Sequence, residues 1–337
     1  MSPKQWKPED LSRLASGFWA SAALHAAVRT GLAAHLAQKG PATAKQSATA
    51  LGLDLRATRM LLDALHALEL AMKQGDSYAL APGLEALLTP DDAHSLSNMV
   101  LHMADLMPAW AELAGSVQSG KPVDMPEEPG DNGEPAGRGH FYRAMRDIAR
   151  QQAPGLAARL GLASGQRLLD LAGGPGVYGL TFAGETPSLA ATVFDLPGAQ
   201  PYFHEEAANH PRGGEVRFMA GDYQKDGLGG PYDVVWVSQV LHGEGPGECR
   251  KLVAKAAAAL KPGGVLWVQE FVLDPEEPKH PWPALFSLNM LINTEDGQSY
   301  TAQEICGFMQ EAGLTGCALD GPTREGSPAA LVKGFKP

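Results

Sequence analysis

Apolar residues recur with the period of an α-helix through much of the first hundred positions. Helices are expected over residues 18–36, 47–51 and 55–70. Two short runs in residues 71–80 flank Gly75-Asp76, a typical turn of a β-hairpin. Three helices followed by a hairpin is the order of a winged helix. The pattern therefore predicts a mainly helical, winged-helix-like domain in residues 1–100.

Helical spacing returns in residues 93–118 and 141–160, and a segment of very different composition separates the two. Residues 120–139 contain four prolines, five glycines and five acidic residues. Such a composition cannot bury a core, so we expect a flexible surface loop there. Residues 101–160 as a whole are therefore expected to form a helical connector.

From residue 165 onward, short apolar runs alternate with helical stretches. Strands are expected over residues 167–171, 191–195, 215–219, 232–238 and 264–270, with a final pair near 315–319 and 329–335. A helix over residues 247–260 precedes a Lys-Pro-Gly-Gly turn. Alternating strands and helices predict a parallel sheet that is covered on both faces. We therefore expect an α/β fold, with a Rossmann-like doubly wound sheet, in residues 161–337.

The overall composition narrows the class of protein. The chain has 337 residues, 44% of them apolar, and no apolar run long enough to span a bilayer. Its first residues lack the apolar core of a signal peptide, so a cytoplasmic protein that does not bind membranes is expected. Cys249, Cys306 and Cys317 are its three cysteines and form no CxxC pair, which disfavours disulfides and a structural metal.

Charge bears on the role of the N-terminal domain. The formal net charge of the chain is −11, but residues 1–100 carry nine basic and nine acidic side chains. A neutral domain offers no basic face for a phosphate backbone, so nucleic acid is not an expected partner. We interpret the domain as a packing or dimerisation module. A winged-helix regulator that senses a small ligand is the alternative from another class of protein.

A strand that breaks into a glycine turn is the strongest chemical signal in the chain. The sequence LLDLAGGPGVYG places Gly173, Gly174 and Gly176 directly after a buried run that contains Asp170. Glycines let the backbone bend sharply and let a cofactor lie against it. Nineteen residues after Gly176 the next strand delivers Asp195, in position to bond ribose hydroxyls. The arrangement predicts a cofactor that contains adenosine.

Residues 174–179 also match the pattern GxGxxG, so a dinucleotide and a dehydrogenase must be considered. Two acids favour S-adenosyl-L-methionine instead. Asp170 would repel a pyrophosphate but can meet a cationic amino-acid group. Asp222 follows the third strand and can bond the adenine amino group, while Tyr223 can stack on the adenine ring. We therefore expect S-adenosyl-L-methionine as the cofactor.

Several short motifs, spread over nearly the whole chain, resemble those of one family. They are FYRAM (141–145), DLAGGPG (170–176), FDLP (194–197), GDY (221–223), LH (241–242), ALKPGG (259–264) and YT (300–301). The family is the class I S-adenosylmethionine-dependent O-methyltransferases with an N-terminal winged-helix dimerisation domain. It includes caffeic-acid-type plant enzymes and bacterial hydroxyneurosporene-, polyketide- and bacteriochlorophyllide-type enzymes. The resemblance implies a homodimer that transfers a methyl group to a small-molecule acceptor.

The resemblance also implies which residues contact the cofactor. Besides the glycine turn they are Asp195, Leu196, Asp222 and Tyr223, with Met145 near the sulfonium and Ser238 where plant relatives have a lysine.

A catalytic base is expected at His242, after the fourth strand, because an imidazole can take a phenolic proton near neutral pH. The resemblance implies that two acids orient this histidine, and Glu270 matches the first of them. The family's His-Asp-Trp is His242-Gly243-Glu244 in this chain, and Ser299 occupies the place of the second acid. Glu270 is therefore the one remaining candidate for orienting the imidazole.

Two helical segments are expected around the methyl acceptor because of their place in the family's topology. They contribute Met103, Met107, Trp110, Phe286, Asn289 and Met290. An apolar pocket of this kind suits an aromatic or otherwise planar small molecule. O-methylation of a hydroxyl group, without a metal, is the predicted reaction. Transfer to carbon or nitrogen, or a diverted reaction without methylation, is the alternative within the fold.

Overall fold

The computed structural model describes residues 5–90, 92–124, 138–276, 278 and 280–337. The chain forms two compact units, Met1–Leu106 with Gly139–Asp147 and Met107–Arg138 with Ile148–Pro337. Residues of the expected connector occur in both units, and residues 125–137 of the expected loop lie outside the described part. None of the described helices is long and apolar enough to cross a membrane.

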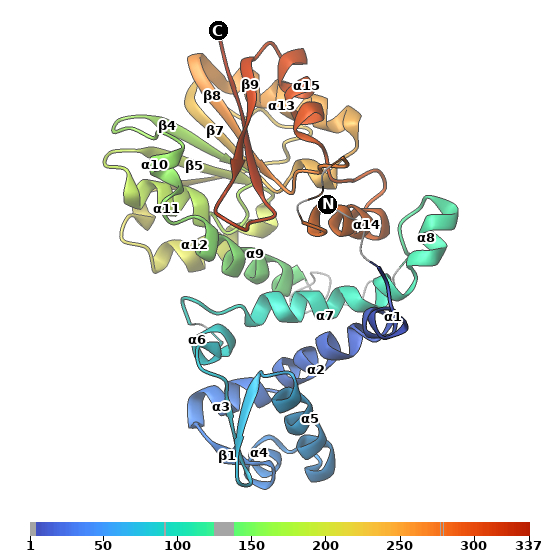
Figure 1. Cartoon of the computed structure of the whole chain (residues 1–337). Helices are drawn as coiled ribbons and strands as arrows, with labels where there is room; N and C mark the ends of the chain where they lie inside the picture. The colour runs from blue at the N-terminus through green and yellow to red at the C-terminus, as the bar shows by residue number, and fades with distance from the viewer. Residues whose placement is uncertain (1–4, 91, 125–137, 277, 279) are drawn as a thin grey trace. The chain divides into compact units, whose positions relative to one another are not determined.

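The first unit is mainly helical and contains a small antiparallel sheet (Figure 1). Its elements are α1 (Pro8–Ala15), α2 (Phe18–Arg29), α3 (Leu32–Lys39), β1 (Ala42–Thr43), α4 (Ala44–Leu51), α5 (Leu55–Ala67), β2 (Ala71–Gln74), β3 (Ser77–Leu80), α6 (Leu84–Leu88), most of α7 (Ser97–Ala111) and the start of α9 (Arg138–Gln152). The sheet has the order β1-β3-β2, and the β2–β3 hairpin turns at residues 75–76, as expected. Helices α3 and α5 share a core that includes Leu32, Leu62 and Leu65.

The second unit is built around a seven-stranded sheet (Figure 1). Its helices are α8 (Leu113–Ser119), α10 (Leu156–Arg159), α11 (Val177–Glu185), α12 (Gln200–Ala208), α13 (Pro246–Ala259), α14 (Trp282–Asn293) and α15 (Ala302–Glu311), with the 3-10 turns η2 (Pro197–Ala199), η3 (Gly213–Glu215) and η4 (Leu241–Gly243). Its strands are β4 (Arg167–Leu171), β5 (Ala190–Asp195), β6 (Arg217–Ala220), β7 (Tyr232–Ser238), β8 (Leu260–Glu270), β9 (Thr315–Pro322) and β10 (Ala330–Phe335). Each strand overlaps an apolar run that predicted it.

The strand order is β6-β5-β4-β7-β8-β10-β9, and strands β4 to β8 run parallel. This is the doubly wound, Rossmann-like arrangement that the alternation of elements predicts, with one difference. Strand β10 pairs antiparallel with both β8 and β9, so the sheet is not wholly parallel. Residues 323–329, between β9 and β10, are too few for the crossover that a parallel pair needs.

Glycine divides two of the stretches that were expected to be single helices. Residues 18–36 form α2 and α3, because Gly31 adopts the left-handed conformation with a φ of +75°. Residues 141–160 divide in the same way into α9 and α10, with Gly155 at a φ of +79°. The stretch 93–118 forms α7 and α8. The periodic spacing of apolar residues does not predict where these helices are interrupted, because it continues on both sides of each interruption.

Apolar side chains fill both faces of the sheet. One cluster joins the strands to α13 and α15 through residues such as Leu252 and Phe308, and the other joins them to α10, α11 and α12. Trp236 of β7 is fully buried, and the ring centroids of Tyr178 and Phe182 lie 5.3 and 5.5 Å from its own. Along the chain, β5 and β6 are added on one side of β4, and β7 and β8 are then added on its other side. Ligands of open α/β sheets bind at such a switch point, beyond the carboxyl ends of the strands.

Candidate active site

The glycine turn lies at the carboxyl end of β4, between that strand and α11. Gly174 and Gly176 have φ values of +55° and +77°, which other residues rarely adopt. A β-carbon on Gly173 would lie 2.6 Å from the carboxyl carbon of Asp170, and one on Gly176 would lie 2.6 Å from the ring of Phe203. The turn therefore needs glycine at these positions. A β-carbon on Gly174 would meet no atom within 4 Å, so its backbone borders open space.

Asp170 is buried against this turn, with 1% of its surface exposed. Its Oδ2 atom accepts a hydrogen bond of 2.9 Å from the backbone N–H of Gly179. Its Oδ1 atom is buried and has no hydrogen-bond partner among the described residues. Burial raises the pKa of Asp170 to about 7. A buried carboxyl oxygen without a donor fits a site that receives the donor from a bound molecule.

Asp195 ends β5 and ties that strand to the glycine turn. Its Oδ2 atom accepts a 2.7 Å hydrogen bond from the N–H of Gly174, and Oδ1 accepts one of 2.7 Å from the N–H of Leu196. Burial raises the pKa of Asp195, and these two backbone hydrogen bonds oppose the rise. A carboxylate oxygen can accept more than one hydrogen bond, so both atoms can still bind hydroxyl groups. The side chain of Leu196 is exposed.

Asp222 and Tyr223 follow β6, the edge strand beside β5. Asp222 accepts a 2.8 Å hydrogen bond from the N–H of Gln224 and pairs with Nζ of Lys225 at 2.8 Å. The hydrogen bond from Lys225 is the main reason that the pKa of Asp222 lies below its usual value. The hydroxyl of Tyr223 donates to Oε1 of Glu244 at 2.6 Å. Both side chains are thus held by neighbours within the protein.

Ser238 ends β7 and belongs to a hydrogen-bond network that sequence reasoning missed. Oε1 of Gln152 accepts from the hydroxyl of Tyr178 at 3.1 Å and from Nε2 of Gln269 at 2.7 Å. Burial raises the pKa of Tyr178 to about 12, and its side-chain hydrogen bonds with Ser238 and Gln269 oppose the rise. The available signal was Gln269 itself, a polar residue within the apolar strand β8.

His242 lies in η4, shortly after β7, and contacts the last residue of β8. Its Nδ1 atom is 2.8 Å from Oε2 of Glu270, and its backbone N–H donates to Oε1 of Glu270 at 3.3 Å. The side chain of Glu270 is 2% exposed and that of His242 is 14% exposed. The ring of Phe286 meets the imidazole edge-on, with 4.8 Å between centroids. Because Nδ1 is engaged with Glu270, Nε2 is the ring nitrogen left to exchange a proton.

Two family models match the chain. One, described as an O-methyltransferase domain, covers residues 131–315, and the other, an O-methyltransferase dimerisation domain, covers residues 12–89. The first match alone spans more than half of the chain. The chain belongs to the S-adenosylmethionine-dependent O-methyltransferases.

Individual proteins are similar over almost their whole length. This O-methyltransferase is 30% identical to 3-hydroxy-5-methyl-1-naphthoate 3-O-methyltransferase of Streptomyces sahachiroi, over 99% of its own chain and 97% of that enzyme. It is 31% identical to the tetracenomycin polyketide synthesis 8-O-methyl transferase of Streptomyces glaucescens, over 98% and 97% of the two chains. The crystal structure of human N-acetylserotonin methyltransferase in complex with SAM shares the fold, with a TM-score of 0.87 at 24% identity, over 100% and 99% of the two chains.

The expectation that Ser299 occupies the place of a second orienting acid in this O-methyltransferase stays a prediction. The hydroxyl of Ser299 donates to the carbonyl of Pro283 at 2.8 Å. Its backbone N–H donates to Oγ of Ser287 at 3.2 Å. The serine therefore bonds to α14 through both groups. Among the described residues, Glu270 is the carboxylate that hydrogen-bonds the imidazole.

All six residues expected around the acceptor of this O-methyltransferase lie on two helices, α7 and α14. Nε1 of Trp110 donates to Oδ1 of Asn289 at 2.9 Å, which joins α7 to α14 within the second unit. Phe286 lies on the same helix as Asn289 and packs against the candidate base. Met290 is buried, and Met107 lies on α7 in the same unit. The second unit therefore brings Phe286 to the candidate base and holds Asn289 through Trp110.

Two of the predicted residues belong to the other unit of the O-methyltransferase. Met103 lies on α7 and Met145 on α9, both within the first unit. Both side chains are partly buried there. Their expected places beside the acceptor and the sulfonium stay predictions.

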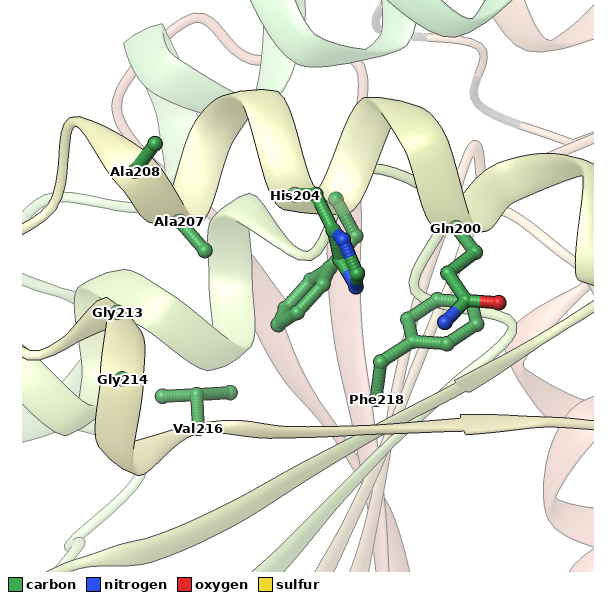
Figure 2. Close-up of a pocket in the computed structure, with 9 residues that line it drawn as sticks. Gln200, His204, Ala207, Ala208, Gly213, Gly214, Val216 and Phe218 are labelled. Carbon is green, nitrogen blue, oxygen red and sulfur yellow. The ribbon is translucent and has the colours of Figure 1, made fainter.

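A hollow of about 470 Å³ lies within the second unit, between α12, η3 and β6 (Figure 2). Its lining includes Gln200, Phe203, His204, Val216 and Phe218. None of the predicted site residues of the O-methyltransferase lines it. The candidate site is instead the carboxyl edge of the sheet, where the acids of β4, β5 and β8 lie.

We predict that donor-site affinity depends on pH through Asp170. With a pKa of about 7, this carboxyl must ionise before it can attract a cationic amino group, so affinity is lost as the pH falls through that value. The Kd for S-adenosylhomocysteine, measured by isothermal titration calorimetry, should therefore be about tenfold lower at pH 8 than at pH 6. Asp170→Asn should remove most of this dependence, while Asp195→Asn should weaken binding at both pH values. Equal affinity of the wild-type enzyme at the two pH values would contradict the prediction.

Proposed function

We propose that this enzyme methylates a hydroxyl group on an aromatic or otherwise planar small molecule, with His242 as the general base. The observation that carries the proposal is the 2.8 Å contact between Nδ1 of His242 and the buried carboxylate of Glu270 at the carboxyl edge of the sheet. One relative is named for a hydroxynaphthoate and another for tetracenomycin polyketide synthesis. These names support a hydroxylated aromatic polyketide as the class of acceptor.

Glu270 gives the imidazole one orientation and one tautomer. A carboxylate bonded to Nδ1 keeps the proton on that nitrogen, so Nε2 of His242 carries the lone pair that accepts a phenolic proton. When the proton arrives, the buried Glu270 balances the positive charge on the imidazole. Phe286, packed edge-on against the ring, limits its rotation. The pair can therefore present one nitrogen to the acceptor in a fixed direction.

The donor site is proposed at the carboxyl ends of β4 to β7. S-adenosylmethionine supplies a methyl group on a positively charged sulfur, which makes that carbon ready for displacement. The residues that would hold it are Asp170, Gly173, Gly174, Gly176, Asp195, Leu196, Asp222, Tyr223 and Ser238, all within the second unit. Two observations support this assignment. The Oδ1 atom of Asp170 has no hydrogen-bond partner among the described residues and can accept a hydrogen bond from the donor. No atom lies within 4 Å of the place where a β-carbon on Gly174 would be, so the donor can lie against that backbone.

We also infer that the enzyme is a homodimer. The match to a dimerisation domain over residues 12–89 supports this state. Large apolar side chains on α1 and at the start of α2 are exposed, namely Leu11, Leu14, Phe18 and Trp19. Exposed apolar side chains on neighbouring helices are typical of a surface that a second copy covers.

The class of acceptor is tested by turnover with a labelled methyl donor. Hydroxynaphthoates and larger phenolic polycycles should be methylated with a kcat/KM at least about tenfold above that of single-ring phenols, because a planar polycycle buries more apolar surface. The matched control is each acceptor with its hydroxyl replaced by hydrogen, which should accept no label. Label transferred to those controls, or to amines alone, would contradict O-methylation of an aromatic hydroxyl.

The base is tested by His242→Ala. This change should lower the rate of methyl transfer about 10²- to 10⁴-fold, the usual share of general-base catalysis, while the Kd for S-adenosylhomocysteine is unchanged. The loss should shrink as the pH rises toward the pKa of the acceptor, because a phenolate needs no base. Glu270→Gln should cost less than loss of the histidine. Near-normal turnover of His242→Ala at neutral pH would show that alignment alone drives the reaction.

The oligomeric state is tested by light scattering at micromolar concentration. The wild-type enzyme should give a mass of twice the chain's 35.5 kDa. The double change Phe18→Glu and Trp19→Glu should shift the mass toward one chain, because it places charges on the exposed apolar surface. Exposed Val117→Glu, on α8, is the matched control and should leave the mass unchanged. A wild-type mass of one chain would rule out the dimer.

A further inference from the structure

Glu244 connects two loops that have separate roles in the proposed function. It lies two positions after His242, and its Oε1 atom accepts the 2.6 Å hydrogen bond from the hydroxyl of Tyr223. The same atom accepts a hydrogen bond of 3.1 Å from Nε2 of Gln224. One carboxylate beside the candidate base therefore binds two consecutive side chains of the loop that follows β6.

Other hydrogen bonds hold the backbone at both ends of this connection. The carbonyl of Glu244 accepts a 2.5 Å hydrogen bond from the hydroxyl of Tyr300, a residue that is 1% exposed. The carbonyl of Tyr223 accepts one of 2.6 Å from Nζ of Lys255 on α13. Because both backbones are held, the bond between Tyr223 and Glu244, together with packing of the ring against the core, limits where the phenol ring can lie.

The surroundings of Glu244 are polar and open on one side. Glu244 and Gln224 line a cavity of about 600 Å³, together with charged side chains that include Lys225 and Glu248. In these surroundings the carboxylate of Glu244 is held by its hydrogen bonds to Tyr223 and Gln224. The ring of Tyr223 packs against the core of the second unit, so the bond to Glu244 fixes the hydroxyl end of that side chain.

The chemistry of the pair makes this bond a strong one. Burial raises the pKa of Tyr223 above its usual value, and the hydrogen bond to Glu244 raises it further, so the phenol keeps its proton. A separation of 2.6 Å between hydroxyl and carboxyl oxygens lies in the range of charge-assisted hydrogen bonds, which are about twice as strong as neutral ones.

We propose that Glu244 is a positioning residue for the methyl donor, acting through the hydroxyl of Tyr223 to hold the ring on which the adenine stacks. The same contact joins the loop that carries Asp222 and Tyr223 to the loop that carries His242. The inference rests on the proposed function, which places Tyr223 beside the adenosine group.

The experiment compares four variants of the full-length enzyme: Glu244→Gln, Glu244→Ala, Tyr223→Phe, and the double variant Tyr223→Phe with Glu244→Ala. Binding of S-adenosylhomocysteine is measured by calorimetry. Glu244→Ala and Tyr223→Phe should each raise the Kd by about tenfold, the typical effect of losing a hydrogen bond to a charged group. The double variant should bind no more weakly than Glu244→Ala, because both single changes break the same bond. Glu244→Gln keeps an acceptor oxygen and should restore binding to within about threefold of the wild type.

Steady-state kinetics supply the second measurement. Glu244→Ala should raise the KM for S-adenosylmethionine while leaving kcat at saturating donor within about threefold of the wild type. Glu248→Ala is the matched control, since Glu248 lines the same cavity but pairs with Lys251, and it should leave the Kd unchanged. The proposal would be wrong if the increases in Kd caused by the two single changes multiplied in the double variant. It would also be wrong if Glu244→Gln bound S-adenosylhomocysteine as weakly as Glu244→Ala.

A structural role alone would give a different result. If Glu244→Ala lowered the melting temperature but bound S-adenosylhomocysteine like the wild type, the positioning role would be wrong. The binding measurement needs no acceptor, so its outcome does not depend on the proposed acceptor or on His242 as the base. If the wild-type enzyme bound the donor tightly but methylated no aromatic hydroxyl, the proposed function would be wrong. The Kd values of the Glu244 and Tyr223 variants would still decide whether Glu244 positions the donor.

Discussion

Burial of carboxylates at the carboxyl ends of parallel strands is the constraint on which the rest of the site depends. Asp170, Asp195 and Glu270 lie at or next to the ends of β4, β5 and β8. Asp170 and Glu270 are buried and Asp195 is partly buried, and removing a carboxylate from water is costly unless hydrogen-bond donors replace the water. Backbone N–H groups meet all three. The donors are those of Gly179, of Gly174 and Leu196, and of His242. The glycine turn, the first turn of α11 and the sharp bend into η4 each place a backbone N–H group beside a carboxylate. The conformation of these loops is therefore constrained by the hydrogen bonds that the carboxylates require.

Much of the fold could be predicted, because the strands of a sheet that is covered on both faces are rich in apolar residues. The strands β4 and β7 have the predicted bounds, although each also contains an aspartate, Asp170 or Asp233. The breaks at Gly31 and Gly155 could not be predicted in the same way, because apolar residues keep their helical spacing on both sides of each glycine. The antiparallel end of the sheet was also missed. It follows from the short link between β9 and β10 rather than from the composition of either strand.

The candidate site was predictable as a set of residues, and one of its contacts, between His242 and Glu270, was predicted as well. The other contacts were not. Family motifs and strand ends point to Asp170, His242 and Glu270, since each lies beside a strand boundary that the apolar pattern marks. The bond between Tyr223 and Glu244 joins two loops that are 21 residues apart. The bond between Trp110 and Asn289 spans 179 residues. No local pattern relates such pairs, because only the packing of the folded unit brings these loops and helices together.

Ser299, at the place where a second acid is expected from the resemblance, bears on the charge of the proposed site. Bound S-adenosylmethionine would supply one positive charge on sulfur, and His242, as the proposed base, would carry one after taking the acceptor's proton. Glu270 provides one negative charge beside His242. The sum over these groups would therefore be zero before and after transfer. A second carboxylate would leave an excess negative charge throughout, whereas Ser299 adds polarity without changing that sum.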